Sequence, residues 1–379
     1  MTIIRVAVPA EPARAYEIRV DPGGLARLGE ICAAAPAHRY AVIADSHVAE
    51  LHGSRAMAAL DSAGLDADLF TFPAGEWNKS AGEWSRLCGE LMGEGFGRDS
   101  AVVAFGGGVA GDLAGFVAST YMRGVPVVQV PTTLLSMVDS CVGGKTGIDA
   151  GQVKNATGTF HHPAAVLIDP DLLSTLPRYQ RISGIAEAVK TAAIRDLEFL
   201  KWIEDRATAL REGEIDATAG LIEHSVGIKA QVVQEDPEER GVRAILNFGH
   251  TFGHALESLS GFSVLHGEAV AAGMRMEARL GESVGVTAAG VGERLDAVLR
   301  GCGLPEVLEP PIDVDELLER AGTDKKSREG DLRWVLFAEL GRVASAADGG
   351  VTHPIPAARA RSPLEAALRE AFEAADSDA

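Results

Sequence analysis

The first half of the chain alternates between short apolar runs and longer amphipathic segments. The runs YAVIAD, ADLFTF, AVVAF, VPVVQVP and AVLI have the length and the β-branched or aromatic content of buried strands. Residues 46–60 and 79–94 carry apolar side chains at helical spacing. Strands separated by such helices predict βαβ units and a parallel sheet. Near the start of the chain, IIRVAV and YEIRV are expected to form a hairpin.

The pattern changes after Leu176-Pro177, where helical periodicity begins to dominate. Long helical runs are predicted at residues 184–205, 212–234, 250–260, 267–284 and 292–302. No repeat of the solenoid type is visible. We therefore expect an α/β domain of the nucleotide-binding type in residues 1–180 and an all-α domain in residues 181–379. A cleft between two such domains is the expected place for a binding site.

Composition and charge narrow the choice of partners. Hydrophobic residues make up 46% of the chain and charged residues 23%, an ordinary globular balance. The net charge is −19, from 35 basic and 54 acidic residues. Nucleic acid and anionic membranes both attract basic surfaces, so neither is expected as a partner. A small anionic substrate stays compatible, because a few lysines in a cleft reverse the local field.

The cysteines and the first residues of the chain favour a reduced, cytoplasmic location. The four cysteines are widely spaced and contain no CxxC pair. A disulfide framework is not expected in a chain of this size, so reduced thiols fit better. The segment MTIIRVAVPAEPARAYEIRV lacks the long apolar core of a signal peptide. No apolar run approaches the roughly 20 residues that span a bilayer.

A glycine-rich turn, FGGGVAGDLAG, follows the run AVVAF and precedes a helical segment. Glycines here let backbone N–H groups approach a pyrophosphate at a helix N-terminus, where the helix dipole favours negative charge. The turn is neither a strict GxGxxG nor a GKT/S loop, so a tight turn without a ligand stays open. Asp45, at the end of YAVIAD, suits a ribose hydroxyl. Glu76 and Lys79, in the loop GEWNK, are either cofactor contacts or solvated charges.

A second stretch, from VPTTLL to NATGTF, gathers charged residues among glycines and small hydroxyl residues. Asp139, Lys145, Lys154 and Asn155 fall within 17 residues of one another. Lysines in such a stretch are well placed to bind phosphate or carboxylate oxygens. The alternative is a surface loop with ordinary lysines. The apolar flanks VVQVPTTLL and AAVLI favour a loop that lies over the core, and therefore a functional one.

Two further charged groups are ambiguous by themselves. Glu187 and Lys190, in SGIAEAVKTA, share one face of a helix and form either a surface salt bridge or a pair in a cleft. The pair at 325 and 326 in TDKKSREG precedes a strand-like stretch. Those lysines are either substrate contacts or part of a solvated turn.

The densest group lies between residues 229 and 266. Lys229, Arg243, Asn247, His250, His254 and His266 all fall within it. Asn247 stands one turn before His250 and is expected to extend the same helix face. His250 and His254 stand four residues apart and would share a helix face, where they either hold one metal together or divide between metal and substrate. Histidines packed in a seam between helices are the third alternative. Ligands taken from His250, His254 and Glu257 would crowd onto a single helix, so a carboxylate from another helix, such as Glu187, closes a tetrahedral zinc site better.

Taken together, these motifs resemble those of the 3-dehydroquinate synthases, within the sugar-phosphate cyclase family. The resemblance runs from about residue 40 to about residue 340. It rests on GGGVAGDLAGF, YMRGVPVVQVPTTLLSMVDSCVGGKTGI, GIAEAVK and LNFGHTFGHALE with LHGEAVAAGM. It implies a Rossmann-like NAD-binding domain followed by a helical metal- and substrate-binding domain. The chain departs from the usual family pattern at Asp149 and Val153.

The resemblance also implies individual roles. A zinc or cobalt ion would be held by Glu187, His250 and His266. NAD would contact Asp45, Glu76, Lys79, Gly107, Gly108, Asp112, Thr132, Thr133, Asp139, Lys145, Lys154 and Thr175. The substrate pocket would be lined by Asp139, Lys145, Lys154, Asn155, Lys190, Lys229, Arg243, Asn247, His254 and one lysine of the pair 325–326, with Lys326 as the expected one. Arg123 would reach the substrate of a second subunit across a homodimer interface.

The implied activity is that of a carbon–oxygen lyase of the shikimate pathway. It would convert 3-deoxy-D-arabino-heptulosonate 7-phosphate to 3-dehydroquinate and phosphate, through transient oxidation by NAD, phosphate elimination, reduction and intramolecular aldol closure. Two alternatives remain at this level. One is another sugar-phosphate cyclase, such as one acting on a carboxylated amino-analogue. The other is a metal-dependent alcohol dehydrogenase, whose metal set usually contains an aspartate and three histidines.

Overall fold

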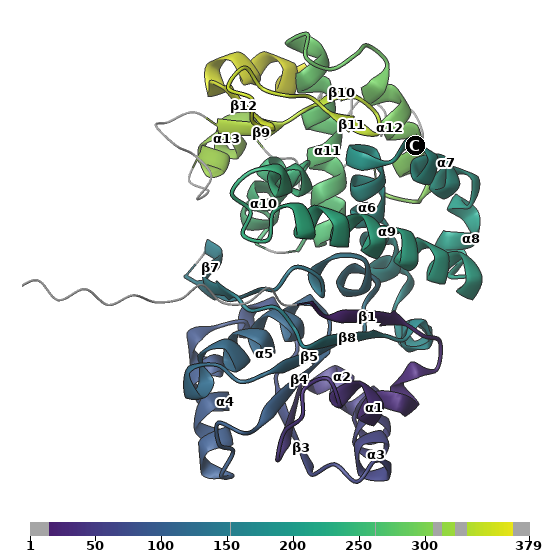
Figure 1. Cartoon of the computed structure of the whole chain (residues 1–379). Coiled ribbons are helices and arrows are strands. Elements are labelled where there is room, and N and C mark those ends of the chain that lie inside the picture. The colour runs from purple at the N-terminus through teal and green to yellow at the C-terminus, as the bar shows by residue number, and fades with distance from the viewer. Residues whose placement is uncertain (1–14, 152, 262, 306–312, 323–331, 367–379) are drawn as a thin grey trace, which may run out of the picture.

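The computed structural model describes residues 15–151, 153–261, 263–305, 313–322 and 332–366. In the first part of the chain, six parallel strands form one sheet (Figure 1). The order across the sheet is β1-β8-β5-β4-β2-β3. The strands span Glu17–Val20 (β1), Tyr40–Asp45 (β2), Ala67–Phe72 (β3), Ala101–Gly106 (β4), Val127–Pro131 (β5) and Ala165–Ile168 (β8). The predicted parallel sheet is confirmed.

Helices cover both faces of this sheet, as its apolar strands require. Along β2, Val42 packs into the core on one face, whereas Ile43 packs into the core on the other. Neighbouring residues of a strand point to opposite faces, so a strand that is apolar throughout must be buried on both. The covering helices include Leu28–Cys32 (α1), Ser54–Ser62 (α3), Ala81–Gly93 (α4) and Gly108–Thr120 (α5).

One expectation about strands stays a prediction, and a second needs correction. β1 pairs in parallel with β8 at the edge of the sheet, and the other half of the expected opening hairpin lies outside the described residues. The stretch read as a loop over the core is an antiparallel hairpin, formed by β6 (Lys145–Ala150) and β7 (Val153–Phe160). The strands were not predicted because their sequence is rich in glycine, which is typical of loops. Gly147 and Gly158 pair with each other across the hairpin. β6 packs on α5, and β7 is largely exposed.

The second part of the chain is helical, as predicted. Its helices span Arg178–Arg195 (α6), Leu197–Asp205 (α7), Ala207–Glu212 (α8), Ile215–Glu235 (α9), His250–Leu259 (α10), His266–Ser283 (α11), Val291–Gly301 (α12) and Val314–Gly322 (α13). The single helix expected at 184–205 is divided at Asp196, whose backbone is extended. The Asp196 carboxylate accepts from the Phe199 N–H and so caps α7.

This part also contains short strands, so it is not purely α. β9 (Leu332–Val335) pairs antiparallel with β12 (Thr352–Ile355), and β10 (Phe337–Glu339) pairs with β11 (Arg342–Val343). Trp334 of β9 is fully buried and packs against Phe252 of α10. The proposed division of the chain at residues 180/181 stays a prediction.

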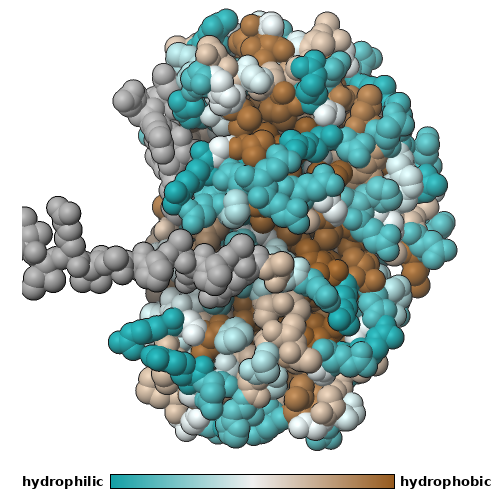
Figure 2. All heavy atoms as spheres, viewed as in Figure 1, coloured by the Kyte–Doolittle hydropathy of each residue, from teal (hydrophilic) through white to brown (hydrophobic). Residues whose placement is uncertain are grey.

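The surface is mixed in character. Figure 2 shows hydrophilic and hydrophobic residues interspersed over the visible face of the protein. Among the helices of the described residues, none is both long enough and apolar enough to cross a membrane.

Candidate active site

The carboxyl ends of β2 and β4 meet at the place where the chain reverses its direction across the sheet. From β2 the chain continues to β3 on one side, and from β4 it continues to β5 on the other. Ligands of open α/β sheets bind at such switch points. Asp45 ends β2 and Gly106 ends β4, so Asp45 and the adjoining Gly107 and Gly108, all predicted to contact the cofactor, lie at this position.

The glycine turn is shaped by close packing around its backbone. A Cβ on Gly106 would lie 2.5 Å from Ala110 Cβ, and one on Gly107 would lie 3.0 Å from Thr133 Cγ2. Helix α5 begins at Gly108, so its free N–H groups point toward the end of the sheet. Asp45 uses Oδ1 to cap the helical turn that follows β2. These features build a site for an anionic group at a helix N-terminus.

A buried lysine collects the other charged residues predicted for the cofactor. Nζ of Lys79 lies 3.1 Å from Glu76 Oε1 and 3.2 Å from Asp112 Oδ2, and it donates to Asn155 Oδ1 at 2.7 Å. Asp149 Oδ1 is 3.8 Å away and also accepts from the Asn155 N–H. Burial alone would lower the pKa of Lys79, but the carboxylates outweigh it and raise that pKa. The lysine therefore stays charged and ties β7 to α5.

Two other residues that were predicted to contact the cofactor, Thr132 and Thr175, lie at the same edge of the sheet. The Thr132 N–H donates to Gly106 O, which keeps this buried threonine beside the glycine turn. Thr175 lies in the 3₁₀ helix Pro170–Thr175 after β8, where its hydroxyl meets Nε2 of His52 at 2.8 Å. Thr175 thus belongs to the same carboxyl edge of the sheet, but no contact joins it to the Lys79 cluster among the described residues.

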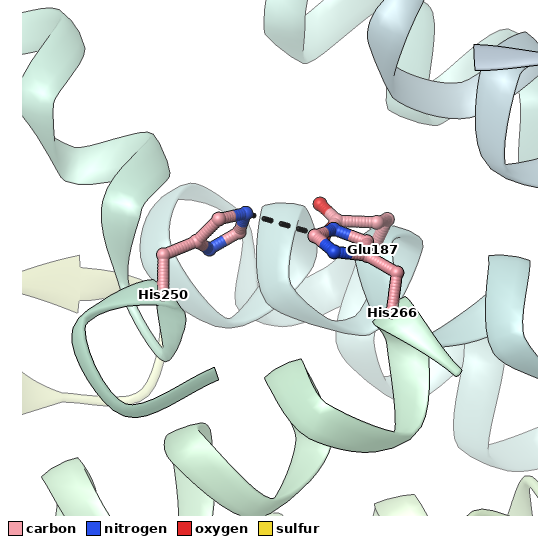
Figure 3. A group of neighbouring side chains, drawn as sticks. All are labelled: Glu187, His250 and His266. Atoms are coloured by element: carbon pink, nitrogen blue, oxygen red, sulfur yellow. Dashed lines mark hydrogen bonds and ion pairs between the residues drawn. The ribbon is translucent and has the colours of Figure 1, made fainter. Parts of the chain in front are cut away.

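Three predicted metal ligands converge from three different helices. Glu187 comes from α6, His250 from the first residue of α10, and His266 from the first residue of α11, and they point toward one another (Figure 3). Glu187 Oε1 lies 3.5 Å from His250 Nε2 and 3.1 Å from His266 Nε2. One ligand atom from each residue lies within 4.8 Å of the others. The glutamate side chain is fully buried, and the imidazoles are 11% and 28% exposed.

The surroundings of the two imidazoles fit a metal ion. Nδ1 of His250 meets the backbone carbonyl of Phe248 at 3.1 Å, and Nδ1 of His266 lies 3.3 Å from Glu257 Oε1. Acceptors at both Nδ1 atoms leave both Nε2 atoms free to face the centre, which is how histidine ligands are usually oriented. One carboxylate and two partly exposed imidazoles match a catalytic zinc site that keeps a position for a further ligand.

Without a metal, the charges at this point hold a proton on His266. Burial alone would lower the pKa of His266, but the carboxylates of Glu257 and Glu187 raise it to about 10. For Glu187, burial would raise the pKa, but Lys190 and His266 lower it below its usual range. The carboxylate of Glu187 is therefore ionised and ready to bind a cation.

This proton predicts how metal affinity depends on pH. A metal ion must displace the proton from His266 Nε2. This proton stays bound as long as the pH is below the pKa of His266, which is about 10. Zinc affinity is therefore expected to rise by about tenfold for each pH unit between pH 7 and 9. Competition titrations with a chelator of known proton affinity measure this slope. An affinity that stays constant over that range would show that His266 is already neutral at pH 7.

Beside the triad lies a buried network of cations. Nζ of Lys190 pairs with Glu187 and lies 3.8 Å from Asp139 Oδ1, and Nζ of Lys229 lies 2.7 Å from the same oxygen. Burial lowers the pKa of Lys229, and the nearby Asp139 offsets this only in part. Burial likewise lowers the pKa of Arg243, which is 1% exposed. A bound anion would stabilise both charges.

Three of the predicted substrate residues are held by contacts within the protein itself. The Arg243 guanidinium donates to Pro237 O at 2.6 Å and to Gly143 O at 3.0 Å. Lys145 forms an ion pair with Glu239, whose other oxygen accepts from Asn247 at 2.7 Å. An incoming anion would exchange some of these contacts for its own.

The placement of one predicted residue differs from the expectation. Asn247 does not extend the face of α10: it ends the 3₁₀ helix Val242–Asn247, and Gly249 with φ of 77° separates it from the helix. His254 does lie one turn after His250, with the two rings 5.2 Å apart. Arg123 is exposed after α5, at the opposite end of that helix from Gly108. Lys326 lies outside the described residues.

The comparisons with known proteins agree with this geometry. Sequence models described as 3-dehydroquinate synthase N-terminal and C-terminal match residues 69–183 and 184–327. A 3-dehydroquinate synthase of Symbiobacterium thermophilum is 44% identical over 336 residues, covering 88% of this chain and 94% of that protein. This chain belongs to the 3-dehydroquinate synthase family. The homologous enzyme of Caulobacter vibrioides is 42% identical over 343 residues, covering 88% and 93%.

Solved structures add a related cyclase. The 2-epi-5-epi-valiolone synthase of Streptomyces hygroscopicus subsp. jinggangensis, solved with NAD+ and Zn2+ bound, superposes with a TM-score of 0.86. It is 27% identical and covers 96% of this chain and 99% of its own. The glycerol dehydrogenase of Schizosaccharomyces pombe, at 16% identity and a TM-score of 0.69, covers 96% and 92% and shares the fold.

Two residues of this 3-dehydroquinate synthase family member were missed in the sequence. Glu239 lies in the acidic run QEDPEERG, which resembles a solvated turn, yet it pairs with Lys145 and Asn247. Glu257 was considered only as a metal ligand, but its carboxylate lies between His266 and Lys154. The helical spacing of three residues from His254 was the one signal that pointed to Glu257.

Proposed function

We propose that this chain is a 3-dehydroquinate synthase, which converts 3-deoxy-D-arabino-heptulosonate 7-phosphate to 3-dehydroquinate and phosphate and is therefore a carbon–oxygen lyase. The observation that carries the proposal is the meeting of Glu187, His250 and His266 beside a set of buried cations, in a chain of this family. Its substrate bears two anionic groups, which the cations Lys190, Lys229 and Arg243 would neutralise.

The proposed cofactors are NAD and a zinc or cobalt ion. The related valiolone synthase, solved with NAD+ and Zn2+, supports this pair. Glu187, His250 and His266 would hold the metal, which as a Lewis acid would ease loss of a hydroxyl proton. Asp45, the glycine turn at 106–108 and the Lys79 cluster would hold NAD, which would take up a hydride and return it, so that no second redox substrate is needed.

Different residues of the chain would bind the two anionic groups of the substrate. Lys229 and Arg243 would bind the carboxylate, since they lie on adjacent segments and are destabilised by burial until an anion arrives. Lys154, Asn155 and His254 would bind the phosphate. Lys154 is on the hairpin and 19% exposed at its side chain, so it can exchange its protein partners for a phosphate oxygen.

The remaining residue proposed for the phosphate is Arg123, contributed by a second copy in a homodimer. Its exposure and its place at the far end of α5 support a role outside its own site. The helix has 13 residues, so the side chain starts about 20 Å from the glycine turn. We further propose a cytoplasmic location, in line with cysteines that are all free.

The carboxylate of the proposed substrate distinguishes this activity from that of cyclases that act on sugar phosphates without a carboxylate. Lys229 and Arg243 are buried cations that a seven-carbon sugar phosphate without a carboxylate would leave without an anionic group of the substrate. Sites built for one polar group reject substrates that lack it by about 10⁴-fold. We expect kcat/KM to differ by about that factor, as measured by phosphate release with each substrate in the presence of NAD+ and zinc. Equal rates, or faster release from the uncarboxylated sugar, would contradict the proposed substrate.

A further inference from the structure

Glu257 on α10 contacts two parts of the site. It has no role in the proposed mechanism. Glu257 is 2% exposed, and its Oε1 atom faces two cations. Nδ1 of His266, at the start of α11, lies 3.3 Å away, and Nζ of Lys154, on β7, lies 2.8 Å away. One carboxylate oxygen therefore contacts both a proposed metal ligand and the hairpin of the sheet-containing part.

The contacts of Lys154 continue toward the cofactor residues. Its Nζ lies 3.5 Å from Glu76 Oε1, and the same oxygen lies 3.1 Å from Lys79 Nζ. A series of charge pairs thus runs from Lys79 through Glu76 and Lys154 to Glu257, and ends on His266. Glu257 is the member of this series on which the helical part and the sheet-containing part meet.

We propose that Glu257 couples the metal site to the proposed cofactor residues around Lys79, so that a metal ion and NAD+ each raise the affinity of the protein for the other. The inference rests on the proposed function, because it takes its two ligands from there. The geometry alone supplies the link between their sites.

Both ligands need the same orientation of one side chain. The metal needs the carboxylate as acceptor for His266 Nδ1, which leaves Nε2 facing the ion. The cofactor side needs it to hold Lys154, since the next residue, Asn155, accepts from Lys79 and sets β7 against the cofactor residues. Whichever ligand binds first fixes Glu257, so the second meets a smaller ordering cost. By linkage, the effect is equal in both directions.

A glutamate that only stabilised the fold would leave the two affinities independent. The discriminating quantity is therefore the ratio of the Kd for Co2+ without NAD+ to the Kd with saturating NAD+. Co2+ is the probe, because its visible absorption reports both its binding and its coordination. The full chain, freed of metal with a chelator, is used throughout.

For the wild-type protein we expect a ratio of about 5 or more, the lower end of typical allosteric couplings. For Glu257→Gln the ratio should fall to about one, and Co2+ affinity without NAD+ should drop by about 10- to 100-fold, as for other partners of metal ligands. For Lys154→Met the ratio should also fall to about one, while Co2+ affinity without NAD+ stays close to that of the wild type. The control Glu223→Gln, an exposed glutamate on α9, should keep both values.

Three results would overturn the inference. A wild-type ratio of one, with both ligands binding, refutes the coupling and leaves the proposed function standing. A wild-type ratio that persists in Glu257→Gln or in Lys154→Met refutes the route through Glu257, and the second variant decides if the first fails to fold. Wild-type protein that binds neither Co2+ nor NAD+ contradicts the proposed function, and the coupling with it.

Discussion

Replacing His250 by alanine is expected to abolish stable metal binding, whereas replacing His254 by alanine is expected to leave it intact. His250 supplies one of three atoms that converge within 4.8 Å, and His254 lies one turn further along α10, where we propose that it binds the substrate phosphate. We expect the Kd for zinc to rise by more than about 100-fold in His250→Ala, beyond the cost of losing a partner of a ligand. In His254→Ala, kcat should fall by about 100-fold with metal retained.

Metal content after dialysis, together with steady-state kinetics, measures this division of roles. His353→Ala is the matched control, because this histidine lies on β12 and hydrogen-bonds a backbone carbonyl outside the site. It should keep both metal and turnover. Equal metal content in His250→Ala and His254→Ala would refute the assignment of His250 as the ligand.

The second large effect is expected from Lys190→Met. The lysine is 1% exposed at its side chain and pairs with the fully buried Glu187, so its removal leaves a buried carboxylate without this partner. Breaking such a pair from one side costs about 3–5 kcal/mol. We expect the metal-free variant to lose about 3 kcal/mol in its free energy of unfolding, measured by urea denaturation. Zinc should restore part of the loss, because the ion takes over as the partner of Glu187.

The same variant tests whether Lys190 only stabilises the fold or also takes part in turnover. Metal affinity should be kept or increased, since a competitor for Glu187 is gone, while turnover falls by about 100-fold or more. Lys201→Met, on α7, removes a lysine from an exposed pair of the same spacing and should cost less than about 1 kcal/mol. Unchanged turnover in Lys190→Met, with metal bound, would remove Lys190 from the active site.

The sheet and the metal triad were predictable because their signals are dense. Continuous apolar strands such as YAVIAD fix a sheet buried on both faces. Ligands taken from a single helix would be crowded, which pointed to a carboxylate on another helix, and Glu187 of α6 does lie beside His250 and His266. The assignment of His266 drew on family resemblance, since spacing alone left several arrangements open.

Backbone detail was the part that sequence reasoning could not reach. Asn247 was placed on the face of α10 by counting, but the positive φ of Gly249 starts the helix only at His250. β7 is exposed along most of its length, so the β6–β7 hairpin lacks an alternating apolar pattern. The sequence therefore contained no periodicity from which these two strands could be predicted. The role of Glu239 depends on a contact with Lys145, 94 residues earlier, that no local pattern reveals.

The most direct test of the proposed function follows phosphate and NADH in one reaction. Purified protein receives NAD+, zinc or cobalt, and 3-deoxy-D-arabino-heptulosonate 7-phosphate, and both products are recorded over time. The proposal predicts many turnovers of phosphate release with no net accumulation of NADH, because the hydride is returned within each cycle. An absence of phosphate release, or NADH accumulating in step with substrate loss as in a dehydrogenase, would contradict it.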